Sequence, residues 1–512
     1  MASESPFLAL AGGLPEWGVA PIVTIALGLV AAAKVGRAFA RRASTDIHVR
    51  GTRVVVPATL SGRGKRRRGA ARLAPPTGSL RLGGVRIDPA DETKHFKFIG
   101  TTGTGKSNAI AALLRSALAR GDRAIIADPN GASLARFYDR YRGDVLLNPF
   151  EPGSVKWDLF GELRSAFDAE NLARSIVPEC EDATGREWRG YARTLIGVLL
   201  RRAAEIGTRD VAEFWRLLAT ADSAELSRLV AGTAAQPFLD SDNARMFTSI
   251  RSVAVSALAA LPHLVAARGR RFAVREWVAR GRGVLFMPYR ADQIASLRTL
   301  VSTWMRLAIF ETLSASELEK PVASEQALEQ RIGSERAPCD RAALRMSRRI
   351  WFVLDELDAL GAIDGLTDAL TRLRKFGGCC VLGVQSAAQV SSIYGAGPAR
   401  AIVENCGNTL ILRCSASEGG GTAAFASHLI GQREVLRRQT VRSRDRGEMF
   451  ARRSGRRSTQ TVRQRVTEAA VLPSEIEQLP DLRGYFKSAS SPCWTLIHLA
   501  SEVRAWPSST SG

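Results

Sequence analysis

The chain has 512 residues, of which 45% are hydrophobic, so it can bury the cores of two or three domains. Its 72 lysines and arginines outnumber its 50 aspartates and glutamates, and the net charge of +22 favours polyanions, either nucleic acid or anionic lipid, as partners. The seven cysteines have no Cys-x-x-Cys spacing and the five histidines are isolated, which argues against a zinc site and a disulfide framework.

The first predicted element is a transmembrane helix over residues 18–35, preceded by a short periplasmic segment, 1–17. Residues 17–33 contain no charge, and at about 1.5 Å per residue they are close to the shortest helix that crosses a bilayer. Basic residues follow directly from Lys34, so the positive-inside rule predicts a single-pass protein with its bulk in the cytoplasm. A cleaved signal peptide and a buried helix are the alternatives. A signal peptide has its positive charge before the apolar run, which disfavours the first.

Residues 36–75 are predicted to form a basic juxtamembrane linker, rich in Gly, Ser and Pro. Its cluster of positive charge would contact anionic lipid headgroups or nucleic acid, and lipid is the simpler interpretation this close to a membrane helix. The cluster consists of Arg63, Lys65, Arg66, Arg67, Arg68 and Arg72.

Residues 100–107 read GTTGTGKS and satisfy the phosphate-loop pattern G-x-x-x-x-G-K-[ST]. A strand-like run precedes them and an Ala- and Leu-rich helix follows, which is the context that this motif requires; a chance Gly-rich turn is the alternative. Lys106 would reach the β- and γ-phosphates of ATP, and Ser107 would bind Mg²⁺. The predicted nucleotide-binding residues of the loop are Gly100, Thr101, Thr102, Gly103, Thr104, Gly105, Lys106 and Ser107.

The chain from about residue 76 has an α/β pattern, in which a second buried strand ends at Asp128. Such β-α-β order predicts parallel strands with right-handed crossovers, and places Asp128 at the nucleotide edge of the sheet. Apolar residues then recur at helical spacing, which predicts an inserted all-α domain over residues 156–270. The α/β domain therefore comprises 76–155 and 271–500, followed by a C-terminal tail, 501–512.

A second decisive stretch is residues 350–356, five apolar residues followed by Asp355 and Glu356. A buried parallel strand would deliver these carboxylates to the phosphate edge, where Asp355 would hold Mg²⁺ and Glu356 would act as general base. Asp358 was expected to be a surface or capping residue. The next strand delivers Gln385 to the same edge, where its amide would contact the γ-phosphate or the attacking water; a helix-capping role is the alternative.

Several motifs, taken in this order and spacing, resemble those of the conjugative coupling proteins of type IV secretion systems, of the TraD/TrwB type. This family is a membrane-anchored branch of the RecA-like motor ATPases that includes FtsK and HerA. The motifs are HFKFIGTTGTGKS at 95–107, DPNG at 128–131, LLNPF at 146–150, EW..YAR at 187–193, VLDEL at 353–357, RKFGGCCVLGVQSAAQV at 374–390 and VLPSEIEQLPDL at 471–482.

The resemblance implies a RecA-like domain with helices on both faces of a mostly parallel sheet, and a homohexamer on the bacterial inner membrane. It implies an ATPase, stimulated by DNA, that passes single-stranded, relaxase-bound DNA to a type IV secretion channel with relaxosome proteins as partners. It further implies that Arg374 stabilises phosphate charge in a neighbouring subunit, a role that Arg372 could imitate. Lys94 stands where relatives have a nucleotide-contacting arginine and lacks the planar guanidinium. Relatives usually have two membrane helices, whereas this sequence shows one clear span.

Residues 437–465 are crowded with arginine. In a ring they could line the channel and contact phosphates, and the alternative is an exposed β-hairpin or a disordered loop without a ligand. Two other functions remain open: an ATP-assembled receptor that recruits protein cargo without translocating DNA, and a double-strand pump of the FtsK type.

Overall fold

The computed structural model of the chain describes residues 46–57, 79–178, 183–318, 349–444 and 457–501. These form two compact units: the described residues up to Thr52 with Gly431–Ala470, and Arg53–Ile430 with the described residues from Val471. The predicted periplasmic segment, the membrane helix over 18–35 and nearly all of the tail 501–512 lie outside the described residues. No helix in the part that is described is long and apolar enough to cross a membrane.

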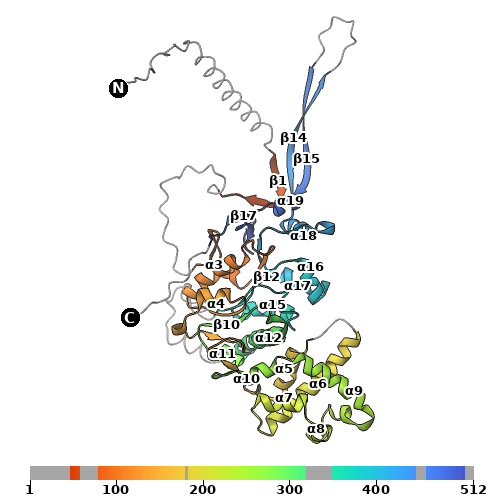
Figure 1. Cartoon of the computed structure of the whole chain (residues 1–512). Helices are drawn as coiled ribbons and strands as arrows, with labels where there is room; N and C mark the ends of the chain where they lie inside the picture. Colours follow the sequence, from red (N-terminus) through yellow and green to blue (C-terminus); the bar gives the residue numbers. More distant parts are fainter. Residues whose placement is uncertain (1–45, 58–78, 179–182, 319–348, 445–456, 502–512) are drawn as a thin grey trace, which may run out of the picture. The chain divides into compact units, whose positions relative to one another are not determined.

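The second unit is built on a ten-stranded sheet (Figure 1). Seven neighbouring strands, from β13 to β7 in the order below, run parallel, and this confirms the predicted α/β class with a mostly parallel sheet. The order is β2 (Arg53–Val55), β17 (Cys493–His498), β16 (Arg483–Lys487), β13 (Asn408–Ile411), β5 (Phe96–Ile99), β12 (Gly378–Val384), β11 (Ile350–Leu354), β6 (Arg123–Pro129), β10 (Val284–Tyr289) and β7 (Val145–Leu146).

The central strands are buried along their whole length, because helices cover both faces of the sheet. Strands β5 and β11 have no exposed position, which explains their continuous apolar sequences FKFI and IWFVL with a single lysine. Helix α3 (Lys106–Ala119) packs on one face with Phe137 of α4 (Ala132–Phe137). The other face carries α12 (Ile294–Leu318), α15 (Leu366–Arg372), α16 (Ala387–Tyr394) and α17 (Ala396–Asn405).

Residues 156–272 contain helices bracketed by a two-stranded parallel pair, β8 (Lys156–Trp157) and β9 (Arg271–Phe272). Figure 1 shows α5 to α9 gathered together beyond α12. Their apolar residues join the core under the sheet, so this region and the sheet share one hydrophobic cluster. The helices are α5 (Ala166–Ile176), α6 (Ala183–Glu205), α7 (Val211–Ala219), α8 (Ser223–Val230), α9 (Ala244–Ala257) and α10 (Leu261–Ala266).

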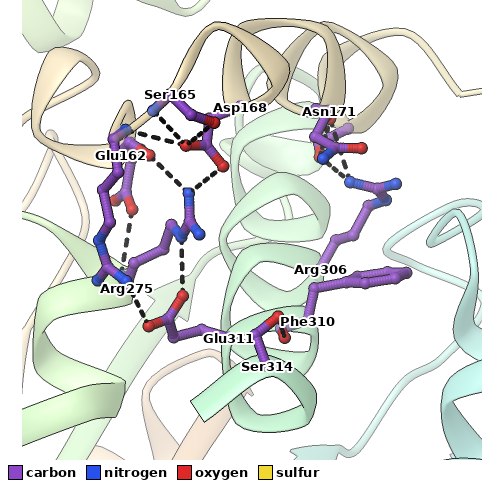
Figure 2. Close-up of polar contacts among 11 residues, drawn as sticks. Glu162, Ser165, Asp168, Asn171, Arg275, Arg306, Phe310, Glu311 and Ser314 are labelled. Carbon is purple, nitrogen blue, oxygen red and sulfur yellow. Dashed lines mark hydrogen bonds and ion pairs between the residues drawn. The ribbon is translucent and has the colours of Figure 1, made fainter. Parts of the chain in front are cut away.

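A network of charged residues joins the helical region to the sheet domain (Figure 2). Arg275 of α11 (Val274–Arg280) contacts Asp168 of α5 and Glu311 of α12. The carboxylate of Glu162 accepts hydrogen bonds from the N–H groups of Val274 and Arg275 at 2.6 and 3.1 Å. Arginine and carboxylates thus fix α5, α11 and α12 together where the chain enters the helical region.

The remaining elements are short. They are β3 (Arg81–Leu82), β4 (Val85–Arg86), α2 (Pro89–Glu92), α18 (Gly421–Ile430), α19 (Pro473–Glu477) and the 3-10 helices η1 (Arg140–Arg142), η2 (Phe160–Glu162), η3 (Gln236–Leu239), η4 (Ser241–Asn243), η5 (Leu373–Phe376) and η6 (Glu418–Gly420).

The first unit is a three-stranded antiparallel sheet of β1 (Ile47–Gly51), β14 (Gln432–Arg444) and β15 (Arg457–Ala469). The arginine-rich segment is therefore a β-hairpin over its described residues, while 445–456 lie outside them. The expected linker, 36–75, is corrected in part: β1 and β2 lie within it, because Ile47, Val49 and Val54 provide strand-forming positions among the polar residues. Its basic cluster, from Arg63 to Arg72, lies outside the described residues.

Candidate active site

The phosphate loop connects the end of β5 to the first turn of α3, as the motif requires. Gly105 precedes the helix with φ of 115°, a conformation that side chains rarely adopt, and a Cβ there would lie 2.9 Å from Cδ2 of Leu482. The N–H groups of Gly100 and Thr101 bond to Val384 and Arg413, which anchor the start of the loop. The loop is thus held against the sheet with the N-terminus of α3 beneath it, an arrangement suited to a phosphate.

Lys106 bends back over this loop. Its Nζ donates to the carbonyl oxygens of Gly100 and Thr101 at 2.6 and 3.1 Å, and the residue is only 7% exposed. Burial lowers the pKa of Lys106, and the charges of Asp355 and Glu356 oppose this shift. Because two neutral carbonyls only partly replace water around an ammonium, a phosphate would be a better partner for Lys106 than the loop itself.

Asp355 meets the loop from a distant part of the chain. The ends of the strands lie within two residues of one another, since Leu354 pairs with Leu382 and Val384, two residues on, pairs with Ile99. Oγ of Ser107 donates to Oδ2 of Asp355 at 2.6 Å, across the intervening strand β12. Burial raises the pKa of Asp355, against the hydrogen bond from Ser107 and the charge of Lys106.

Glu356 and Gln385 lie at the same edge. Nε2 of Gln385 donates to Oε1 of Glu356 at 3.2 Å. Oε1 of Gln385 accepts from Oγ1 of Thr102 in the phosphate loop, also at 3.2 Å. Gln385 therefore bridges the acidic strand and the loop. Burial raises the pKa of Glu356, and the charges of Asp355 and Asp358 raise it further. A carboxylate with a raised pKa next to a phosphate loop is suited to accept a proton from water.

Asp128, near the carboxyl end of β6, is a further carboxylate at this edge of the sheet. It is buried, and its carboxylate accepts from the backbone N–H groups of Ser133 and Leu134 at 2.9 and 2.7 Å, so it caps α4. Burial nevertheless raises the pKa of Asp128 to about 6, and the charge of Asp355 contributes.

The sequence did not predict the part that three further residues play at this edge of the sheet. A Cβ on Gly383 would lie 1.8 Å from the carbonyl oxygen of Asp355, so only glycine lets β12 pass the turn that carries the carboxylates. The hydroxyl of Tyr289, at the end of β10, is buried without a partner among the described residues. Asp358, expected to be a surface or capping residue, is half-buried, and its Oδ1 also has no partner among the described residues. Tyr289 could have been found, because it too ends a parallel strand.

The structure does not bring Lys94 to the phosphate loop of its own chain. Lys94 precedes β5 whereas the phosphate loop follows it, so the two lie at opposite ends of one strand. Its Nζ is 2.7 Å from Oδ1 of Asp91. Arg374 also lies at that opposite edge, exposed in η5 before β12, and so is not brought to the phosphate loop of its own chain.

The donor set at this edge fits Mg²⁺ better than a transition metal. Ser107 and Asp355 offer hard oxygen ligands already in contact, and phosphate oxygens and water normally complete such a site. Among the described residues, no group of three or more His, Cys, Asp or Glu could hold a metal on its own. The arrangement therefore suits a metal that arrives with its phosphate ligand.

Comparison with known proteins gives one consistent result. The family model described as "Type IV secretion-system coupling protein DNA-binding domain" matches residues 79–499. Coupling protein TraD of Escherichia coli (strain K12) is 28% identical over 415 residues, covering 79% of this chain and 52% of TraD, so the chain spans about half the length of that relative.

Solved structures of plasmid coupling protein TrwB agree with this match. The complex with ADP and Mg²⁺ is 29% identical, with a TM-score of 0.70 over 90% of this chain and 95% of that one. The complex with the non-hydrolysable ATP analogue ADPNP is 28% identical, with a TM-score of 0.71 over 91% and 97%. The resemblance inferred from the sequence motifs is thereby confirmed.

Proposed function

The chain belongs to the family of type IV secretion-system coupling proteins, and from that premise we propose that it is an ATP-driven DNA translocase. It would link relaxase-bound, single-stranded DNA to a type IV secretion channel, with relaxosome proteins as further partners. The observation that carries the proposal is the 2.6 Å contact between Ser107 and Asp355, which joins the phosphate loop to the acidic strand end. ATP and Mg²⁺ are the cofactors, consistent with the nucleotides in the TrwB complexes.

The side chains divide the work of ATP hydrolysis. Lys106, now bonded to the Gly100 and Thr101 carbonyls, would bind phosphate oxygens, and Ser107 and Asp355 would hold Mg²⁺. When bound, Mg²⁺ neutralises phosphate charge. Glu356 takes the proton from the attacking water. Gln385 is hydrogen-bonded to both Glu356 and Thr102, so its position would link cleavage of the γ-phosphate to the conformation of the phosphate loop.

A ring explains where Arg374 acts. It is exposed at the edge of the sheet away from its own phosphate loop, which supports a role at the site of a neighbouring subunit. We therefore include a homohexamer, in which Arg374 stabilises phosphate charge in trans. We also include single-pass attachment to the inner membrane through residues 18–35, with the bulk in the cytoplasm and residues 156–270 as an inserted all-α domain.

ATP hydrolysis by the full chain tests the nucleotide site. Lys106→Ala should abolish ATP binding and hydrolysis, because the buried ammonium is lost from the loop. Lys156→Ala is the matched control, since Lys156 also donates to a backbone carbonyl, that of Val265, but lies outside the phosphate loop, and this variant should hydrolyse ATP as the wild type does. If Lys106→Ala protein hydrolysed ATP as the wild type does, the assigned site would be wrong.

Movement along DNA tests translocation separately. Tethered-DNA measurements on the full chain should show ATP-dependent movement, and single-stranded DNA should stimulate hydrolysis less as salt is increased. A protein that binds ATP and cargo but stays in place on DNA would instead be a substrate receptor.

A further inference from the structure

The hairpin β14–β15 has two faces that differ in charge. Residues directly opposite each other in an antiparallel pair share a face. On the first face, Arg433 is opposite Glu468 and Arg437 lies two pairs further on. Both arginines form ion pairs with Glu468, at 2.9 and 2.8 Å, and Arg437 also pairs with Asp46 at 3.0 Å. The arginines of this first face are therefore matched by carboxylates.

The second face keeps its positive charge. Here Arg438 is directly opposite Arg463, and the next pair toward the base of the hairpin places Arg465 opposite Leu436. Arg438 and Arg463 form no ion pair with any residue that the structure describes, and both are exposed. Arg465 reaches only Glu434, at 3.8 Å, and its side chain is 72% exposed. We call Arg438, Arg463 and Arg465 the open arginine face.

Two arginines directly opposite in a β-ladder repel each other and destabilise the pairing. The first face shows that carboxylates at neighbouring positions can remove this cost in the same hairpin. The repulsion that remains between the arginines of the open arginine face is explained if a polyanion neutralises their charge. Guanidinium groups suit this role, because their planar donors bind phosphate oxygens in pairs.

We propose that the open arginine face binds the sugar-phosphate backbone of DNA. The inference rests on the proposed function, and the description of the family as DNA-binding favours DNA over another polyanion. The two strands contain no aromatic residue, so they offer no surface for base stacking, and the contact would be independent of sequence. Each strand has 13 residues, which at about 3.3 Å per residue is long enough to lie along several phosphates.

The test compares two double variants of the full chain. Arg438→Gln/Arg463→Gln removes two charges from the open face, and Arg433→Gln/Arg437→Gln removes two from the matched face of the same hairpin. Binding of a labelled oligothymidylate is measured by fluorescence anisotropy without nucleotide between about 50 and 200 mM salt. The open-face pair should weaken binding and reduce the slope of log K against log salt by about 1.4, or about 0.7 for each lost phosphate contact. The matched-face pair should change the slope much less.

Equal changes in the two variants, or no change in either, would overturn the proposal. So would an unchanged affinity for oligothymidylate together with weaker partition of the open-face variant into phosphatidylglycerol nanodiscs, because the ligand would then be lipid. ATP hydrolysis without DNA should be the same in both variants and the wild type. A wild-type protein without ATP hydrolysis would contradict the proposed function, whereas the DNA-binding comparison of the two double variants would still decide whether the open arginine face binds DNA.

Discussion

Two groups of buried carboxylates in the same unit show how a structural site differs from a reactive one. In the charge network of Figure 2, Asp168 and Glu311 face Arg275, whose side chain is 17% exposed. Burial opposes ionisation of Asp168, but the hydrogen bonds from Arg275 and Ser165 prevail and lower its pKa. This network is closed, because each of these carboxylates has a cationic partner within the protein.

The nucleotide edge has the opposite balance. Asp128, Asp355, Glu356 and Asp358 approach one another, and the buried cation nearby, Lys106, is bonded to backbone carbonyls. Burial raises the pKa of Glu356, and two like charges add to the effect. Burial alone does not mark such a site, since it also raises the pKa of Glu162 in the network to about 7. What distinguishes the nucleotide edge is repulsion between carboxylates that the charges of Lys106 and Arg136, among the described residues, offset only in part.

The strongest test of this difference is Glu356→Gln. The amide keeps an oxygen to accept from Gln385 but cannot take a proton, so the hydrolysis rate should fall by about 10²- to 10⁴-fold while ATP still binds. Removing one of the repelling charges should leave the melting temperature unchanged or higher. Single-turnover kinetics and thermal denaturation measure the two effects. Normal hydrolysis by this variant would show that Glu356 is not the base.

Arg275→Met should produce the reverse pattern. It leaves Asp168 and Glu311 buried without their shared cation, and should lower the free energy of unfolding by about 3 to 5 kcal/mol. Below the unfolding transition, ATP affinity should match the wild type. Denaturant unfolding and nucleotide titration provide the measurements.

Arg290→Met is the control, because the Arg290–Asp292 pair is exposed and its loss should not be measurable. A similar loss of stability in both variants would mean that the network of Figure 2 is no stronger than a surface pair.

Local patterns were sufficient to predict most of the nucleotide edge. The phosphate loop and the strand ending at Asp355 each follow a short-range rule, and parallel strands bring their carboxyl ends to one edge. The same rule places Lys94 at the other edge of the sheet, because Lys94 precedes β5 whereas the phosphate loop follows it. Gly383 could not be assigned, because its role depends on β12 lying between β5 and β11, a strand order that no local pattern specifies.

The charge network was beyond sequence reasoning for a related reason. Glu162, Asp168, Arg275 and Glu311 come from four separate segments, and each is an ordinary polar residue in its own surroundings. Their pairing depends on the packing of α5 and α11 against α12. The open arginine face was visible only as an excess of arginine, since the register of the hairpin decides which charges meet a carboxylate.

The smallest expected effect concerns pH and Asp358. In the proposed mechanism Glu356 must be ionised, so activity should be lost as pH falls through the pKa of Glu356, which lies above its ordinary range. Asp358→Asn removes one of the like charges that raise this pKa. The midpoint of the acidic limb of the pH–rate profile should therefore move to lower pH, by less than about 1 unit, with little change in the rate at neutral pH.

Glu205→Gln is the matched control for this shift, because Glu205 is exposed and paired with Arg202 on α6, in the helical region. Its midpoint should equal that of the wild type. An unchanged or higher midpoint in Asp358→Asn would mean that the charge of Asp358 does not act on Glu356. A lower midpoint would show that the charge of Asp358 raises the pKa of Glu356, the proposed acceptor of the proton from the attacking water.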